Sequence, residues 1–190
     1  MLTTRPLILA SQSPRRSQLL EQAGYTFTVK ARPIDESFPE DMPVREVPEY
    51  LARNKAEAVR DFITADEIVL TADSVVILDH KIYGKPRNEA EAYATLRELS
   101  GRMHTVVTGV CLMDKERMIS FAGVSDVHMG ELTEEEIKYY VTKHQPFDKA
   151  GGYAVQEWIG LCKIHRIEGT YANIMGLPTD LVYEHLQQFG

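Results

Sequence analysis

The run from Ile68 to Leu78 constrains the fold more than any other part of the chain. It is mostly apolar and rich in β-branched residues, and it is interrupted at Asp73 and Ser74. Such a run predicts a buried strand. A carboxylate in a buried strand costs free energy unless it is paired, hydrogen-bonded or bound to a metal. Asp73 therefore needs a partner, unless it lies at a strand end and caps a loop.

Strand-like and helix-like segments alternate along the chain. Asn88 with Glu91 and Thr133 with Glu136 have the spacing of capping boxes, which predicts helices that end near Gly101 and at Lys143. Hydrophobic spacing predicts further helices over 14–23, 48–62 and 178–189, and strands over 7–10, 104–113, 118–129, 153–156 and 161–167. The strands before and after 114–115 form a predicted hairpin. This order favours an α/β or α+β sheet with helices outside and leaves the strand order open.

Composition limits the classes of function. The chain has 190 residues, 44% hydrophobic and 26% charged, which fits one globular domain over 1–190 or two small lobes that share a core. A net charge of −7 argues against broad binding to nucleic acid or to an anionic membrane. The N-terminal apolar run is too short for a signal peptide, so we expect a cytoplasmic protein. Cys111 and Cys162 lack CxxC spacing and are expected to be buried free thiols.

The segment Ser11-Gln12-Ser13-Pro14-Arg15-Arg16 places two cations at a helix start. Ser13 suits the N-cap and Pro14 the first helical position, so Arg15 and Arg16 fall in the first turn. Cations are unfavourable there because free N–H groups already make that end positive. A bound phosphate would compensate, with N–H groups, hydroxyls and guanidinium groups converging on it. The alternative is a solvated pair of arginines.

Carboxylates and lysines supply the remaining candidates. Asp73 suits Mg²⁺ or Mn²⁺ and can take a proton from an attacking water, and Glu36 of the Asp35-Glu36 pair can add a ligand. Lys55, Lys85 and the Asp148-Lys149 pair are candidate phosphate partners, although each lysine alone has the features of a surface residue. The six histidines have no ligand-like spacing, and no P-loop, GxGxxG, GxSxG or HExxH motif occurs.

Taken together, the motifs resemble one known family. They are LASQSPRR, IDE at 34–36, ARNKA at 52–56, TADSVV at 71–76, GKP at 84–86, SGRMHTVVTGV at 100–110, FDKAGGYAVQ at 147–156 and GLP at 176–178. In this order they cover essentially the whole chain, and the chain resembles the Maf family of nucleotide pyrophosphatases, also called septum formation proteins.

The resemblance implies a fold, an activity and a set of residues. The fold is an elongated, two-lobed α/β structure similar to inosine triphosphate pyrophosphatases, with a cleft between lobes and often a homodimer. The activity is divalent-cation-dependent hydrolysis of nucleoside triphosphates with release of pyrophosphate. Asp73 matches the family's proton acceptor. Its phosphate- and metal-handling positions match Ser11, Arg16, Glu36, Lys55 and Lys85.

The sequence is most similar to the family branch that acts on dTTP and UTP. That branch is marked by Arg15, by a hydroxyl residue at Ser74 and by Gln156, although Thr is usual where Ser74 stands. The branch that acts on 7-methylguanosine triphosphate commonly has an aromatic residue and an acid in place of Arg15 and Gln156. A Gln amide offers both an acceptor and a donor, which matches the edge of uracil or thymine. The alternatives are the same chemistry on a modified purine or on a broad nucleotide set, and a nucleotide-sensing regulator of septum formation without turnover.

Overall fold

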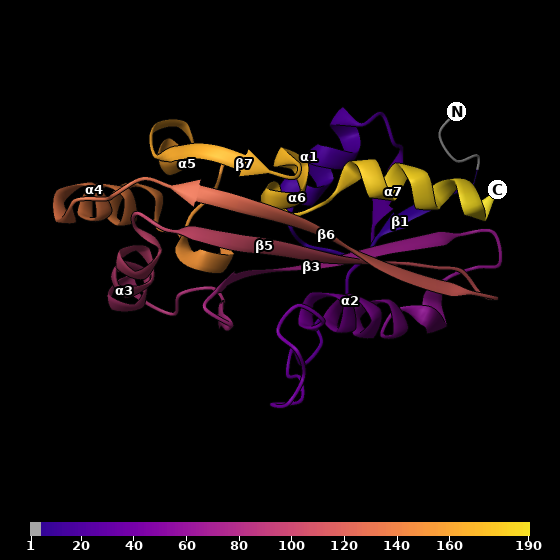
Figure 1. Ribbon diagram of the computed structural model, residues 1–190. Helices are drawn as coiled ribbons and strands as arrows, with labels where there is room; N and C mark the ends of the chain where they lie inside the picture. The colour runs from indigo at the N-terminus through magenta and orange to yellow at the C-terminus, as the bar shows by residue number, and fades with distance from the viewer. Residues whose placement is uncertain (1–4) are drawn as a thin grey trace. The chain divides into compact units, whose positions relative to one another are not determined.

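The computed structural model describes residues 5–190 and confirms a mixed α/β architecture (Figure 1). Within these residues the strands are β1 Leu7–Leu9, β2 Phe27–Val29, β3 Ile68–Leu78, β4 Lys81–Tyr83, β5 Met103–Met113, β6 Met118–Met129 and β7 Ile164–Glu168. They form one seven-stranded sheet in the order β2-β1-β3-β5-β6-β7, with β4 paired to β3. The long central strand β3 has the bounds that its β-branched run predicts.

The helices cover the sheet. They are α1 Pro14–Gln22, α2 Val47–Glu57, α3 Glu89–Leu99, α4 Glu134–His144, α5 Trp158–Cys162, α6 Tyr171–Met175 and α7 Thr179–Leu186, with 3₁₀ turns at Arg60–Phe62, Ala150–Gly152 and Gln187–Phe189. The capping box at Thr133 and Glu136 is complete. At α3 the Asn88 side chain accepts from Glu91 N, whereas the Glu91 carboxylate accepts from Arg87 N, so only half of the predicted box forms.

Parallel and antiparallel pairs occur in the same sheet. Strand β1 pairs in parallel with both β2 and β3, and Leu7 lies opposite Phe27 and Ile68. Parallel neighbours require crossover connections, and α1 and α2 supply them. Strand β4 pairs with β3, and β7 with β6, in antiparallel orientation. This strand order, which sequence patterns leave open, places β1 beside the first three residues of β3, with Leu9 opposite Leu70.

The chain divides into two compact units. Unit 1 contains the chain up to Asp73 together with Thr108–Gly123 and Gly176–Gly190, and unit 2 contains Ser74–Val107 and Val124–Met175. Strands β3, β5 and β6 contribute residues to both units. The expectation of a single family domain over 1–190 stays a prediction.

In unit 1 the sheet lies between α2 on one face and α1 with α7 on the other (Figure 1). The cluster under α2 is made mostly of small and branched side chains, namely Ile8, Ala10, Ala52, Ala56, Val59, Ile63, Val69 and Cys111, together with Met113. Small alanines on the inner face of α2 let the helix approach the strands closely. This close packing fixes the position of Lys55 in the last turn of α2.

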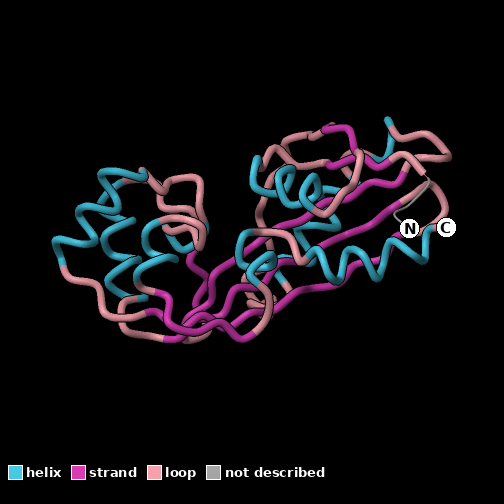
Figure 2. Tube along the Cα trace, turned by 90° about the horizontal axis from the view of Figure 1, so that it is seen from above, coloured by secondary structure: helices cyan, strands magenta, loops and turns pink. Residues whose placement is uncertain are grey.

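In unit 2 the helices α3 and α4 lie together at one end of the strands (Figure 2). Their buried faces share a core with the strands, formed by residues that include Leu96, Leu99, Val106, Val127, Ile137 and Tyr140. Tyr140 is fully buried although it carries a hydroxyl group. A buried hydroxyl requires hydrogen-bond partners, and those of Tyr140 lie in the segment that follows α4.

Three of the expected elements are wrong. Residues 153–156 are not a strand but a turn, because Gly151 and Gly152 adopt φ of 70° and 68° and redirect the chain. The strand expected over 161–167 is displaced to Ile164–Glu168, because Leu161 and Cys162 end the short helix α5. The helix expected over 48–62 ends at Glu57 and is followed by the 3₁₀ turn at Arg60–Phe62.

Both cysteines are free, but only one is buried. Cys111 lies in the core of unit 1, where burial raises the thiol pKa to about 12, whereas Cys162 is exposed on α5. The expectation of a buried Cys162 is therefore wrong. Across residues 5–190, no helix has the length and apolar character needed to cross a membrane.

The close approach of α2 to β5 gives a stability prediction. A Cβ at Gly109 would lie 2.2 Å from both Glu49 N and Pro48 C, so the helix backbone would have to move. We expect Gly109→Ala to lower the free energy of unfolding by about 1–3 kcal/mol, measured by urea denaturation. The matched control is Gly84→Ala, whose Cβ meets nothing within 4 Å and which should change stability by less than about 0.5 kcal/mol. Equal effects of both variants would contradict this packing.

Candidate functional site

Asp73 lies in the middle of β3 with Lys55 as its partner. The side chains of Asp73 and Lys55 are 13% and 16% exposed, and Lys55 Nζ donates to Asp73 Oδ1. The same ammonium group lies 2.7 Å from Oε1 of Glu36, whose side chain is 50% exposed. One lysine thus bridges two carboxylates. The carboxylate in the buried strand has the partner that its desolvation cost requires.

Local geometry explains why this lysine meets this aspartate. Thr71 Oγ1 donates to the carbonyl oxygen of Ala52 over 2.6 Å in a buried hydrogen bond that fastens α2 to β3. Asp73 follows Thr71 by two residues and faces the same side of the strand. Lys55 follows Ala52 by three residues and lies on the same helix face. Sequence patterns do not predict this role of Thr71. The signal that could have indicated it is a hydroxyl residue two positions before Asp73 in an apolar run.

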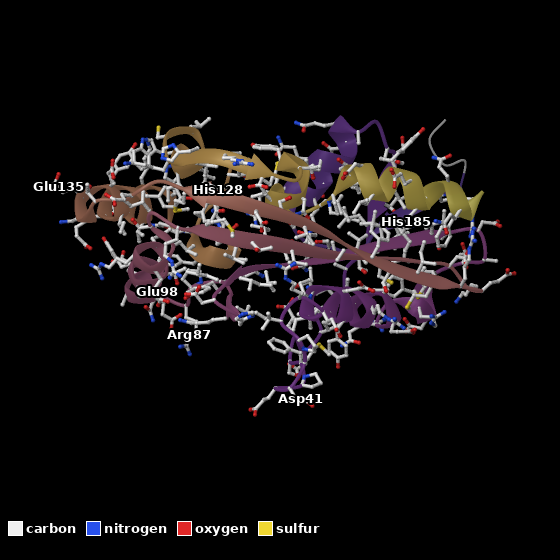
Figure 3. The ribbon with its side chains drawn as sticks, viewed as in Figure 1. Asp41, Arg87, Glu98, His128, Glu135 and His185 are labelled. Atoms are coloured by element: carbon white, nitrogen blue, oxygen red, sulfur yellow. The ribbon has the colours of Figure 1, made fainter. Side chains whose placement is uncertain are left out.

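In the loop before α2, the side chains of Asp35 and Glu36 have different partners. Glu36 reaches Lys55, whereas the Asp35 carboxylate accepts from Ser37 N at 3.0 Å and from Ser37 Oγ at 2.9 Å. Asp35 therefore stabilises its own turn. Asp41 lies at the outer tip of the same loop and points away from α2 (Figure 3). Of these three acids, Glu36 is the one that joins the lysine.

The arginine segment forms a second part of the site in unit 1. Ser11 is buried, and its Oγ accepts from Ser13 N and from Arg16 Nη1, both at 3.2 Å. Arg16 Nε donates to the carbonyl oxygen of Gly176 at 2.8 Å, which fixes the guanidinium group. Ser13 occupies the N-cap position of α1 but makes no side-chain cap bond, so the expected cap is only positional. Arg15 is half-buried in the first helical turn.

Electrostatic interactions connect this segment to the two carboxylates that Lys55 bridges. Burial lowers the pKa of the Arg16 guanidinium, the charge of Arg15 lowers it further, and the charges of Asp73 and Glu36 oppose these effects. The carboxylates therefore stabilise a desolvated arginine. With Lys55 included, the cluster holds one more cation than it holds carboxylates. Such a set favours a polyanionic ligand.

The carboxylate arrangement fits a divalent cation. Glu36 and Asp73 already share one cationic group, Lys55 Nζ, and carboxylate oxygens are the ligands that Mg²⁺ and Mn²⁺ prefer. Throughout residues 5–190, no three or more His, Cys, Asp or Glu side chains gather in a way that could hold a metal. A metal at this pair would therefore complete its coordination with substrate phosphates and water, which is usual for Mg²⁺.

The remaining predicted residues belong to unit 2. Ser74 is half-buried on β3, and Lys85 is exposed in the loop after β4. That loop is held by a hydrogen bond from Gly151 N to the carbonyl oxygen of Gly84 at 3.1 Å. Gln156 lies in the turn before α5, and its Oε1 atom is buried without a hydrogen-bond partner among the described residues. A buried acceptor without a partner is costly, and a donor from water or from a ligand would satisfy it.

Lys149 differs from the expected surface lysine. It is 8% exposed, and its Nζ lies 2.7 Å from Asp148 Oδ1 and 3.4 Å from Glu157 Oε1. It is engaged in ion pairs inside unit 2, so the suggestion of a phosphate partner at 148–149 finds no support. His104, also buried, lies 2.6 Å from the Tyr153 hydroxyl, and burial lowers its pKa to about 4, so it stays neutral at pH 7.

Comparison with known proteins identifies relatives over nearly the full length. The family described as Maf-like protein matches residues 6–189. A protein of Bacteroides thetaiotaomicron named dTTP/UTP pyrophosphatase is 48% identical over 183 residues, which cover 96% of this chain and 95% of the relative. A Porphyromonas gingivalis protein of the same name is 46% identical and covers 97% of this chain and 94% of the relative.

Similarity to solved structures is weaker. The Ham1 protein of Staphylococcus aureus aligns with 66% of this chain and 72% of its own, at 14% identity and a TM-score of 0.49. A Ham1 protein of Coxiella burnetii aligns with 66% of this chain and 73% of its own, at 17% identity and a TM-score of 0.44.

The bridging role of Lys55 gives a second stability prediction. Lys55→Met leaves the carboxylates of Asp73 and Glu36 without their shared cation. We expect the free energy of unfolding to fall by about 1–3 kcal/mol, measured by urea denaturation. The control is Lys30→Met, which removes a 43% exposed lysine whose pair with Glu67 spans 3.2 Å. That loss should stay below about 1 kcal/mol. A smaller effect at Lys55 than at Lys30 would contradict the assignment of Lys55 as the necessary counter-ion.

Proposed function

The chain belongs to the Maf family, and on this premise we propose that it is a nucleoside triphosphate pyrophosphatase that hydrolyses dTTP and UTP. The products are the nucleoside monophosphate and pyrophosphate. The observation that carries the proposal is the half-buried Asp73 with Lys55 and Glu36 around it. Desolvation of a carboxylate in a buried strand costs free energy, and its ion pairs offset that cost. A hydrolase needs such a carboxylate as a general base that activates water.

Asp73 is the proposed proton acceptor. One of its carboxylate oxygens takes a proton from the attacking water as the αβ-phosphoanhydride bond breaks and pyrophosphate leaves. Lys55 contacts Asp73 in the free protein and is the nearest cation to exchange this contact for a phosphate oxygen. Its ammonium group then offsets the charge that develops on the leaving pyrophosphate, and the family resemblance assigns Lys85 the same task. Both lysines therefore belong to the proposed reaction machinery.

The segment from Ser11 to Arg16 is the proposed phosphate-binding element. It combines the hydroxyls of Ser11 and Ser13, the guanidinium groups of Arg15 and Arg16 and the N–H groups at the start of α1. Such a helix start binds phosphate well. Arg16 is already oriented by Ser11 and Gly176, so little side-chain entropy is lost when an anion binds.

Glu36 and Asp73 would hold the divalent cation, Mg²⁺ or Mn²⁺. When bound, the cation would neutralise phosphate charge and make the attacking water more acidic. In the free protein, oxygen atoms of both carboxylates already lie around the positive charge of Lys55. The preference for oxygen ligands follows from the donor set, because the described histidines and cysteines form no cluster with these acids.

Gln156 is the proposed selector of the base. Its buried Oε1 lacks a partner and can accept from the N3–H group of uracil or thymine, while its Nε2 can donate to a base carbonyl. Arg15 and Ser74 are the other residues assigned to base preference. The names of the two relatives agree with a pyrimidine substrate. A 7-methylguanosine or broad substrate range is the alternative for the same chemistry.

Pyrophosphate release from a panel of triphosphates tests the function. UTP, dTTP, CTP, GTP and 7-methyl-GTP are each incubated with the protein and Mg²⁺ or Mn²⁺. The proposal expects the highest kcat/KM for UTP and dTTP and no turnover when the metal is chelated. Release from no nucleotide at all would instead support a sensing protein. The homodimer, the cytoplasmic location and the absence of nucleic-acid and membrane partners stay predictions of the sequence.

Removal of the proposed proton acceptor tests the chemistry. Asp73→Asn keeps the shape of the side chain but removes its charge and its basicity. We expect kcat on UTP to fall at least about a hundredfold while the protein stays folded by circular dichroism. Asp41→Asn at the exposed loop tip is the matched control and should keep full activity. Near wild-type activity of Asp73→Asn would show that Asp73 is not the base.

A charge at position 156 tests base selection. Gln156→Glu replaces a donor with a charged acceptor, which would face a carbonyl of a pyrimidine. We expect kcat/KM on UTP and dTTP to fall roughly ten- to a hundredfold, with a smaller fall or a gain on GTP and 7-methyl-GTP, whose N1–H and amino groups can donate. Gln187→Glu, an exposed change near the C-terminus, should alter neither. An equal fall on every nucleotide would mean that Gln156 supports the fold or the reaction instead.

A further inference from the structure

One buried hydroxyl holds both ends of the turn that carries Gln156. The carbonyl oxygen of Ala154 accepts from Glu157 N at 3.1 Å, so Ala154–Glu157 is a β-turn with Val155 and Gln156 at its centre. The Tyr140 hydroxyl of α4 accepts from Ala154 N at 3.0 Å and donates to Glu157 Oε2. Tyr140 is fully buried, so water does not compete for these bonds.

The Glu157 carboxylate is held from its other sides by two basic groups. Lys149 Nζ lies 3.4 Å from Oε1, and His144 Nδ1 lies 3.4 Å from Oε2. The His144 ring stacks on the Tyr140 ring with centroids 4.7 Å apart. Burial and the nearby Glu157 charge raise the pKa of Tyr140, which keeps the phenol protonated as a donor. The turn is thus fastened by side chains from α4 and from the loop before it.

Backbone packing also restrains the turn. A Cβ at Gly160 would lie 1.7 Å from the carbonyl oxygen of Val155, so α5 packs directly against the centre of the turn. No strand pairing supports residues 153–157, because they lie outside the sheet. The orientation of Gln156 therefore depends on Tyr140, Glu157 and the close contact at Gly160.

We propose that Tyr140 and Glu157 are positioning residues that set base selectivity by fixing the Ala154–Glu157 turn and with it the amide of Gln156. The inference rests on the proposed function, because it concerns the same nucleotide substrate. Hydrogen-bond recognition of a base requires a donor and an acceptor held in place. Tyr140 and Glu157 bond to each other and to the turn, whereas Asp73 bonds to Lys55, so a looser turn should reduce discrimination between bases more than it reduces the chemical step.

The test removes the hydroxyl and leaves the ring. Tyr140→Phe is compared with Tyr139→Phe, the neighbouring tyrosine, which is 43% exposed and whose hydroxyl accepts from Lys143. kcat/KM is measured for UTP and for GTP with Mg²⁺. We expect the UTP to GTP ratio to fall roughly three- to tenfold in Tyr140→Phe and to stay unchanged in Tyr139→Phe. A purely structural loss would lower both rates together and leave their ratio unchanged.

A second variant and a second measurement keep the outcomes distinct. Glu157→Gln removes the charge that Lys149 and His144 hold, and should also lower the ratio. Amide hydrogen exchange should become faster at Ala154 in Tyr140→Phe, because its N–H loses its acceptor. An unchanged ratio in both variants overturns the positioning role and leaves the proposed function standing. Absence of pyrophosphate release in the wild type overturns the proposed function and the positioning role with it.

Discussion

The contact between the Lys55 ammonium and the Asp73 carboxylate is the interaction on which the rest of this molecule depends. It allows a charge to lie in the central strand of the sheet, and it requires α2 to cross that strand at one fixed place. The Thr71 to Ala52 hydrogen bond and the alanine-rich face of α2 supply that placement. The loop that carries Glu36 and the arginine segment that carries Arg16 then gather around the same charges. Catalytic potential and stability therefore share one cluster.

The proposed phosphate-binding groups and the proposed base-recognising group are stabilised in different ways. In unit 1 the functional groups are charged and hold one another through ion pairs, so a ligand must exchange with existing contacts. In unit 2 the Gln156 amide has an unsatisfied acceptor and depends on its neighbours for orientation. The charged side chains are proposed to bind the phosphates, which all nucleotides share. The neutral amide is proposed to recognise the base, in which nucleotides differ. A base reader of this type needs a rigid support, and Tyr140 with Glu157 provides it.

Sequence patterns predict the elements that depend on local periodicity. They do not predict elements or side-chain partners that depend on contacts between residues distant in the chain. The β-branched run predicts the bounds of β3 as the structure has them, and the complete capping box predicts the start of α4, which ends one residue after the expected Lys143. The apolar residues of 153–156 predict a strand, yet two positive-φ glycines and the Tyr140 hydroxyl, fourteen positions before Ala154, make the segment a turn. Asp73 stood out because a charge in an apolar run is anomalous by itself. The identity of its partner could not be predicted, because Lys55 meets Asp73 only through the crossing of α2 over β3. No sequence pattern indicates that crossing.

Glu36, Lys55 and Asp73 form the proposed site at which metal and triphosphate bind together. Its most direct test is a crystal structure with Mn²⁺ and a UTP analogue whose αβ bridging oxygen is replaced by an imido group, with Mn²⁺ located by anomalous scattering. We expect Mn²⁺ to be ligated by the carboxylates of Glu36 and Asp73 and by the analogue, with Lys55 moved from Asp73 to a phosphate oxygen. A bound analogue whose Mn²⁺ touches neither carboxylate, with the Lys55 to Asp73 contact intact, would contradict it.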